Sequence, residues 1–171
     1  IEEGHISAIG KASEIIPQFS SSAKIENLRQ SILMPSFTDA HIHLLTYGLS
    51  LQHVNVEMPT KQSCLNQIAN HVKNTDHGKW IIGHGWDQNI WADGYGSNKD
   101  LDNLSTQHPI YLTHKSLHSG WANSSALKIA GINHHTPNPR GGIIQRDASG
   151  NPNGILLENA MTKHESGLAL V

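Results

Sequence analysis

The sequence predicts an α/β fold, because predicted strands alternate with predicted helices along the chain. Residues 53–58 alternate between apolar and polar side chains at the period of a strand. Residues 60–74 instead place apolar side chains at the spacing i, i+3, i+4 and i+7, which is typical of a helix with one buried face. With 171 residues, the chain is long enough to bury a hydrophobic core of its own.

Residues 1–35 are expected to form short strands and turns that precede the main fold. Residues 5–9 alternate at a period of two after a Glu3-Gly4 turn signal. A second apolar stretch, residues 31–34, ends at Pro35, which has no N–H to donate to a sheet. We interpret this region as a small β unit.

Residues 36–58 are expected to contain two strands joined by a short helix. The first strand is predicted over residues 36–44 and runs into a loop, and the helix follows over about 45–51. The second strand is predicted over residues 53–58, where valines favour extended backbone.

The rest of the chain, residues 59–171, is expected to be a mixed α/β region. Thr60 can cap a helix that extends to about Asn74. The residues of this helix that are predicted to face the core are Leu65, Ile68, Ala69 and Val72. The other predicted elements are strands that begin at residues 80 and 109, a polar surface loop over 92–108, a helix from Asn123 or Ser124 through Ala130 that Gly131 ends, a hairpin of 142–146 with 154–157, and a helix from Glu158.

Two histidines separated by one residue are the main candidate for chemistry. In a strand, residues i and i+2 project from the same face, so His41 and His43 can present two imidazoles to one point while Ile42 packs on the other side. Neutral imidazoles are good ligands for zinc, iron or nickel. A His-x-His pair alone is weak support for a metal site, but Asp39 and the preceding apolar residues place this pair at the end of a predicted strand.

Several stretches of the chain resemble a known family of enzymes. Residues 34–44 (MPSFTDAHIHL) are similar to the first barrel strand of the amidohydrolase superfamily, with its pattern PGFIDxHxH. Residues 80–89, 118–127 and 142–159 resemble amidohydrolase family 3, which includes N-substituted formamide deformylases. Leu117 departs from the family pattern, in which a small residue often precedes the histidine.

The resemblance implies a (β/α)₈ barrel with a β-sandwich formed by the two ends of the chain. A complete barrel takes about 250 residues, so this chain is expected to supply only part of one. The expected organisation is part of the sandwich over residues 1–35, the first barrel strand and the start of the barrel over 36–58, and a mixed α/β insertion with a barrel segment over 59–171.

The resemblance also implies hydrolysis of a non-peptide C–N bond in an amide or formamide with the help of a divalent metal. His41 and His43 would be metal ligands, with zinc as the first choice of metal and iron or nickel as alternatives. The remaining ligands and the catalytic aspartate are expected beyond residue 171, so this part alone is expected to be inactive. The alternative is a non-catalytic regulatory or binding protein built on an amidohydrolase scaffold.

Further site candidates follow from their positions in the chain. His118 comes between an apolar strand and a helix, a position suited to the rim of a pocket, and the resemblance implies a substrate contact there; the alternative is a hydrogen bond at the helix start. Trp86 and Asp87 lie in a cluster of polar and aromatic residues that either lines the substrate pocket or fixes the long loop. His84 is expected to alternate with Trp86 on one side of its strand and to face the same cavity. Asp39 is expected to support the metal ligands rather than to bind the metal.

Composition excludes several other classes of partner. The formal net charge is only −2, and no basic stripe favours nucleic acid. No apolar run approaches the roughly 20 residues that cross a bilayer, so no membrane partner is expected. The single cysteine, Cys64, permits no internal disulfide, which agrees with a cytoplasmic location. The expected partners are a small amide substrate, the remainder of the barrel and a second copy that pairs with an exposed strand edge.

Overall fold

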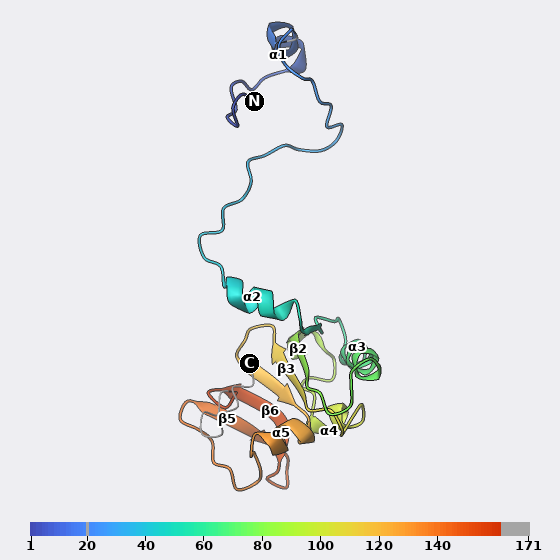
Figure 1. Ribbon diagram of the computed structural model, residues 1–171. Helices are drawn as coiled ribbons and strands as arrows, with labels where there is room; N and C mark the ends of the chain where they lie inside the picture. The colour runs from blue at the N-terminus through green and yellow to red at the C-terminus, as the bar shows by residue number, and fades with distance from the viewer. Residues whose placement is uncertain (20, 162–171) are drawn as a thin grey trace. The chain divides into compact units, whose positions relative to one another are not determined.

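The computed structural model describes residues 1–19 and 21–161, and the chain divides into two units, Ile1–Ile42 and His43–Val171. Each unit is described by itself (Figure 1). The helix that was predicted to start at Glu158 falls for the most part outside the described residues, and its first residue is the last residue of β6 (Pro152–Glu158).

The described residues of unit 1 contain one helix, α1 (Ala12–Phe19), and an isolated bridge between Glu2 and His5. The predicted strands at residues 5–9 and 31–34 are wrong, since neither is a strand among the described residues of this unit. An extended segment becomes a strand only when a neighbour completes its hydrogen-bond ladder. Apart from the Glu2–His5 bridge, the described residues provide no such neighbour here.

Unit 2 begins with α2 (Leu44–Ser50), which confirms the short helix predicted over about 45–51. The strand predicted over residues 36–44 does not form within the described part of the chain, and Leu44 already belongs to α2. The apolar character of this segment was therefore a poor guide to its backbone, because apolar side chains do not replace strand pairing.

A six-stranded mixed sheet forms the centre of unit 2, in the order β1-β2-β3-β4-β6-β5. Its strands are β1 (Val54–Asn55), β2 (Ile81–Trp86), β3 (Ile110–His114), β4 (Ser119–Ala122), β5 (Gly142–Arg146) and β6 (Pro152–Glu158). The pairs β1–β2 and β2–β3 are parallel, and the pairs beyond β3 are antiparallel. The predicted mixed α/β region and its hairpin are thus confirmed.

Four short or medium helices accompany this sheet, and their start signals are local. They are α3 (Lys61–Lys73), the 3₁₀ helix η1 (Gln88–Ile90), α4 (Asn98–Asp102) and α5 (Ser124–Ile129). Thr60 and Ser63 form a capping box at the start of α3, as the sequence predicted in part. Ser97 and Asp100 form another at α4, which lies inside the predicted loop over 92–108. The sequence prediction did not include this helix.

Hydrophobic residues cover both faces of the sheet. Successive residues of a strand point to opposite faces, and in β3 Ile110 and Leu112 belong to one buried cluster while Tyr111 belongs to the other. The first cluster includes Cys64 and Ile68 of α3, and the second includes residues of α5. α3 packs against β1 and β2, and α5 packs against β3 and β4 (Figure 1). Unit 2 is therefore layered, with helices on both sides of the sheet.

Strand β4 was not predicted, because its sequence Ser-Gly-Trp-Ala has few of the residues that favour strands. All four of its residues are buried between β3 and β6. Gly120 is required here, since an added Cβ would collide with the ring of Tyr111. Tertiary packing thus determines this strand.

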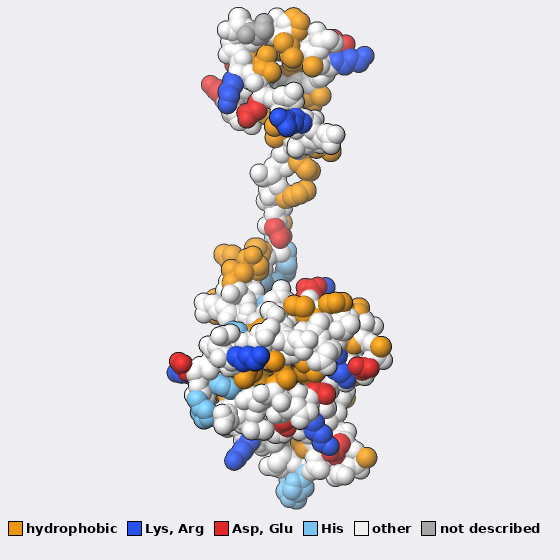
Figure 2. All heavy atoms as spheres, turned by 90° about the vertical axis from the view of Figure 1, so that its right-hand side faces the viewer, with side chains coloured by type: hydrophobic (Ala, Val, Ile, Leu, Met, Phe, Trp, Pro, Cys, Tyr) orange, Lys and Arg blue, Asp and Glu red, His pale blue; other side chains and the backbone are white. Residues whose placement is uncertain are grey.

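The surface of the molecule agrees with the small net charge. On the face shown in Figure 2, basic and acidic side chains lie interspersed among neutral ones. The helices of the described residues include none with the length and apolar character required to cross a bilayer.

One buried amide joins several elements of unit 2. Asn123 is fully buried, and its Oδ1 accepts the N–H groups of Ile110, at 3.0 Å, and Ala126, at 2.9 Å. Its Nδ2 donates to the carbonyl oxygens of Ser105, at 3.0 Å, and His108, at 2.8 Å. The start of β3, the preceding loop and the N-terminus of α5 therefore depend on this side chain.

Replacing this amide is expected to destabilise unit 2. The substitution Asn123→Ala leaves buried donors and acceptors without partners, and we expect a loss of about 3 kcal/mol in the free energy of unfolding. Urea denaturation followed by tryptophan fluorescence measures it. Asn103→Ala, at an exposed position next to α4, is the matched control. Equal losses for the two variants would contradict the role of Asn123.

Candidate functional site

The two histidines of the predicted metal pair fall in different units. His41 lies in unit 1, where Asp39 Oδ1 accepts its backbone N–H at 3.0 Å. His43 lies in unit 2 as the residue before α2, and its carbonyl oxygen accepts the N–H of Tyr47 at 2.9 Å. Among residues 1–19 and 21–161, no three or more His, Cys, Asp or Glu side chains are grouped to hold a metal ion. The pair remains a prediction.

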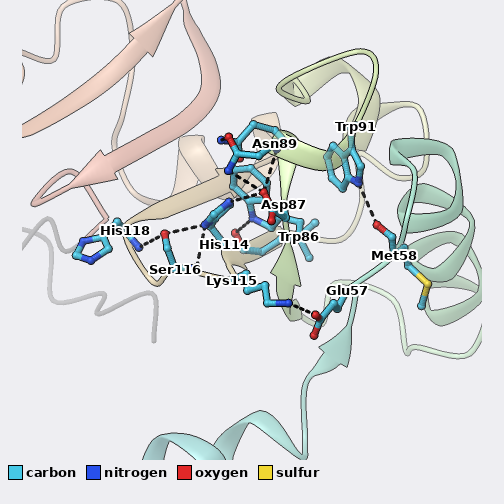
Figure 3. Close-up of polar contacts among 12 residues, drawn as sticks. Glu57, Met58, Trp86, Asp87, Asn89, Trp91, His114, Lys115, Ser116 and His118 are labelled. Carbon is cyan, nitrogen blue, oxygen red and sulfur yellow. Dashed lines mark hydrogen bonds and ion pairs between the residues drawn. The ribbon is translucent and has the colours of Figure 1, made fainter.

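Polar side chains gather at the carboxyl ends of the three parallel strands. Glu57 lies two residues after β1, Asp87 follows β2, and His114 ends β3. Lys115 follows at once and forms an ion pair with Glu57 (Figure 3). The hydrogen bond and the charge of Glu57 raise the pKa of Lys115. The carboxyl ends of parallel strands are where α/β proteins commonly bind ligands, so this edge is a candidate site.

Asp87 is held in place by the turn that it starts. Its Oδ1 accepts both the backbone N–H and the side-chain N–H of Asn89, each at 2.9 Å. The backbone hydrogen bond from Asn89 lowers the pKa of Asp87; burial opposes this shift, and the Asn89 side chain and His114 add to it. The carboxylate therefore remains ionised at neutral pH, and it can accept hydrogen bonds from a ligand.

His114 lies beside Asp87 and was not singled out from the sequence. Its side chain is 8% exposed, and its Nε2 is 3.6 Å from Asp87 Oδ1. Its Nδ1 accepts the backbone N–H of Ser116 at 2.9 Å, so a neutral ring carries its proton on Nε2, toward Asp87. Nε2 is a buried atom without a hydrogen-bond partner. A signal was present, since His114 comes at the end of a predicted strand that contains Ile110, Tyr111 and Leu112, just as the His41–His43 pair was expected at the end of its strand.

Trp86 is fully buried and presents no surface to a ligand. Its indole N–H donates to the carbonyl oxygen of Leu112 at 2.9 Å, and its ring meets His114 edge to face at a centroid distance of 4.6 Å. Trp91 packs against it and donates to the carbonyl oxygen of Met58 at 3.1 Å. These rings fix the strand ends that carry Asp87 and His114.

His84 is partly buried on β2, and its relation to Trp86 differs from the prediction. A register shift between these residues, at Gly85 with φ +101°, interrupts the alternation of the strand. Trp86 consequently joins the same buried cluster as Ile81, five residues earlier, and does not share a side with His84. Burial lowers the pKa of His53, and the neighbouring His84 lowers it further.

His118 lies just before β4 and is paired with a residue that sequence reasoning missed. Its backbone N–H donates to Ser116 Oγ at 3.3 Å, and that hydroxyl lies 2.8 Å from Nδ1 of His114 (Figure 3). The Nδ1 of His118 is 2.9 Å from Oε2 of Glu158, at the end of β6. Both side chains are exposed, and both line a hollow of about 540 Å³. The candidates in unit 2 thus form two groups, one around Asp87 and His114 and one around His118 and Glu158, and the hydroxyl of Ser116 joins the two.

Comparisons with known proteins identify relatives over most of the chain. The model of the amidohydrolase family matches residues 24–168. Protein LONG AFTER FAR-RED 3 of Arabidopsis thaliana is 33% identical over 162 residues, which make up 94% of this chain and 28% of that protein. N-substituted formamide deformylase of Arthrobacter pascens is 33% identical over 164 residues, 94% of this chain and 30% of the deformylase. The chain spans less than a third of either relative.

A solved structure of a metal-dependent hydrolase also resembles this chain. The crystal structure of an uncharacterized metal-dependent hydrolase from Pyrococcus furiosus resembles this fold with a TM-score of 0.50 and 25% identity. The likeness covers 75% of this chain and 24% of that one. Together with the family match, it confirms the resemblance that the sequence motifs predicted.

The ionised form of Asp87 is expected to stabilise unit 2 in a pH-dependent way. Because folding lowers its pKa, the stabilisation is present above the unfolded-state pKa of about 4 and is lost as the pH falls through the folded-state value. Asp87→Asn should therefore reduce stability at pH 7, and the difference from the parent chain should shrink toward pH 3. Urea denaturation at a series of pH values measures this.

Asp76→Asn, at an exposed aspartate of unit 2, is the matched control and should show a small, nearly constant difference. A difference for Asp87→Asn that stayed the same from pH 7 to pH 3 would contradict the assigned role of the carboxylate.

Proposed function

Because the chain belongs to the amidohydrolase family, we propose that it forms part of a metal-dependent hydrolase that cleaves a non-peptide C–N bond in an amide or formamide. The family match over residues 24–168, which includes both histidines of the His-x-His pair, is the observation that carries this proposal. The likeness to the formamide deformylase supports the class of bond.

His41 and His43 would hold the metal, each through one nitrogen of a neutral imidazole. This donor chemistry suits zinc, and iron or nickel are alternatives. Asp39 would support the pair by fixing the backbone at His41, as its hydrogen bond to that N–H indicates. When bound, a divalent ion lowers the pKa of a coordinated water from about 15.7 toward ~7 and polarises the carbonyl that is attacked.

Two imidazoles are an incomplete set of ligands. A structural or catalytic zinc site uses at least three protein ligands, and the described residues group no three candidates. Because the chain spans less than a third of the Arabidopsis relative and of the formamide deformylase, we propose that the other ligands and the catalytic base come from parts of the protein outside these 171 residues, and that this chain has no hydrolytic activity alone.

On the substrate side, Asp87 is suited to accept a hydrogen bond, since it stays ionised at neutral pH and is only 22% exposed. We propose His118 as a second substrate contact and His84 as a third, on the strand that leads to Asp87. Trp86 would contribute through packing, because it holds the end of β2 in place.

A non-catalytic binding or regulatory protein on the same scaffold is the competing function. It predicts that the full-length protein contains no stoichiometric metal. The hydrolase predicts stoichiometric metal and turnover of N-benzylformamide that a chelator abolishes. Metal analysis and this assay, both on a chain that continues through the remaining barrel, separate the two functions.

The metal pair is testable on this chain directly. Competition between the chain and a chromophoric chelator for Zn²⁺ gives its affinity, and we expect His41→Asn and His43→Asn each to lower that affinity about tenfold or more, because each removes one ligand. The chain itself should show no chelator-sensitive hydrolysis.

His71→Asn is the matched control, because His71 is an exposed histidine on α3 outside every candidate site. If all three variants bound Zn²⁺ as tightly as the parent chain, the assignment of His41 and His43 would be wrong.

A further inference from the structure

The hollow beside His118 lies where β4 and β5 begin and β6 ends. His118 precedes β4, Gly142 begins β5 and Glu158 ends β6, and the pairing of these strands brings the three residues together. The hollow measures about 540 Å³, large enough for a small molecule. Ser119, two glycines and the larger, mostly apolar residues Tyr95, Ile143 and Leu157 line the rest of it.

Glu158 orients the ring of His118. An ionised carboxylate has no proton to give, so the 2.9 Å contact between Oε2 and Nδ1 requires that Nδ1 carry the proton. In a neutral ring, Nε2 is then a hydrogen-bond acceptor. The two residues are also joined through the backbone, because the N–H of Glu158 donates to the carbonyl oxygen of His118 at 3.0 Å. The pair therefore has a defined geometry although its side chains are exposed.

The backbone around this pair is strained. Glu158 has φ +51° and Leu117, the neighbour of His118, has φ +66°. Within the described part of unit 2, these are the two residues other than glycine with positive φ. Such conformations are unfavourable for side chains with a Cβ and concentrate at binding sites.

The glycine wall of the hollow is equally restricted. Gly141 has φ +72°, and a Cβ on Gly142 would collide with the backbone of Ala160. Both positions therefore require glycine, and backbone rather than side chains forms this wall of the hollow.

We propose that this hollow is a subsite for the N–H group and the apolar N-substituent of an amide. His118 Nε2 accepts the N–H, Glu158 keeps the ring in the accepting tautomer, and Tyr95, Ile143 and Leu157 contact the apolar substituent. The identity of the ligand as an amide rests on the proposed function. The subsite itself rests on the hollow, the pair and the strained backbone around it.

Two ligands test this subsite: the amide nitrogen carries a hydrogen in one and a methyl group in the other. The chain is titrated with N-benzylformamide and with N-benzyl-N-methylformamide, and binding is followed by two-dimensional NMR. We expect N-benzylformamide to shift the signals of residues around His118 and to bind about fivefold more tightly, the factor that one ordinary hydrogen bond contributes. Equal affinities, or shifts located elsewhere, would overturn the proposal.

Substitutions at His118 and Glu158 separate the contribution of the His118 ring to ligand preference from the contribution of the ring's orientation. His118→Ala should abolish the preference for the N–H ligand, whereas His71→Ala on α3 should retain it. Glu158→Gln should also retain it, because the amide oxygen still accepts the Nδ1 proton. Glu158→Gly removes the carboxylate without backbone strain, since glycine adopts positive φ readily, and should weaken the preference. A preference that survived His118→Ala would reject the assigned acceptor.

The tautomer of the His118 ring can be measured without any ligand. Long-range proton–nitrogen spectra of the histidine rings should show neutral His118 with its proton on Nδ1, and Glu158→Gly should move the population toward Nε2. The Nε2 tautomer in the parent chain would overturn the role of Glu158. Amide binding at His118 in a protein that binds no metal would support the subsite while rejecting the hydrolase, so the two failures are distinguishable.

Discussion

The parallel pairing of β2 with β3 determines where the polar side chains of unit 2 meet. Its register places Trp86 opposite His114, so that Asp87 and His114 leave the sheet at the same edge. The register shift after His84 turns Trp86 into the core, where its indole N–H bonds to β3 and holds the two strand ends together. A buried aromatic side chain is therefore the support on which the charged edge depends.

Where local chemistry was sufficient, the sequence predicted the fold of unit 2 well. The helix after Thr60, the helix after Asn123 and the hairpin of β5 with β6 all have caps, glycines or turn residues at fixed positions. Strand β4 could not be found in this way, because Ser119–Ala122 is extended only between β3 and β6. The helix α4 was missed although its capping box was visible at Ser97 and Asp100.

The strands predicted before Leu44 failed for a related reason. Apolar periodicity indicates which side chains prefer to be buried, but a strand also needs a partner for its backbone. The described residues of unit 1 supply only a bridge from Glu2 to His5. The same dependence affects the candidate sites. His41 and His43 were found from their spacing and stay a prediction, whereas the contacts of His114 and His118 arise from residues that only the fold brings near.

His114 and His118 have opposite hydrogen-bonding roles because different groups contact their Nδ1 atoms. The N–H of Ser116 donates to Nδ1 of His114, so a neutral ring there presents Nε2 as a donor toward Asp87. The carboxylate of Glu158 accepts from Nδ1 of His118, so a neutral ring there presents Nε2 as an acceptor. A buried donor suits the support of a carboxylate, and an exposed acceptor suits contact with a ligand. The sequence contains 13 histidines, but it does not show which of them donate and which accept. That difference follows from the residue that each Nδ1 contacts in the fold.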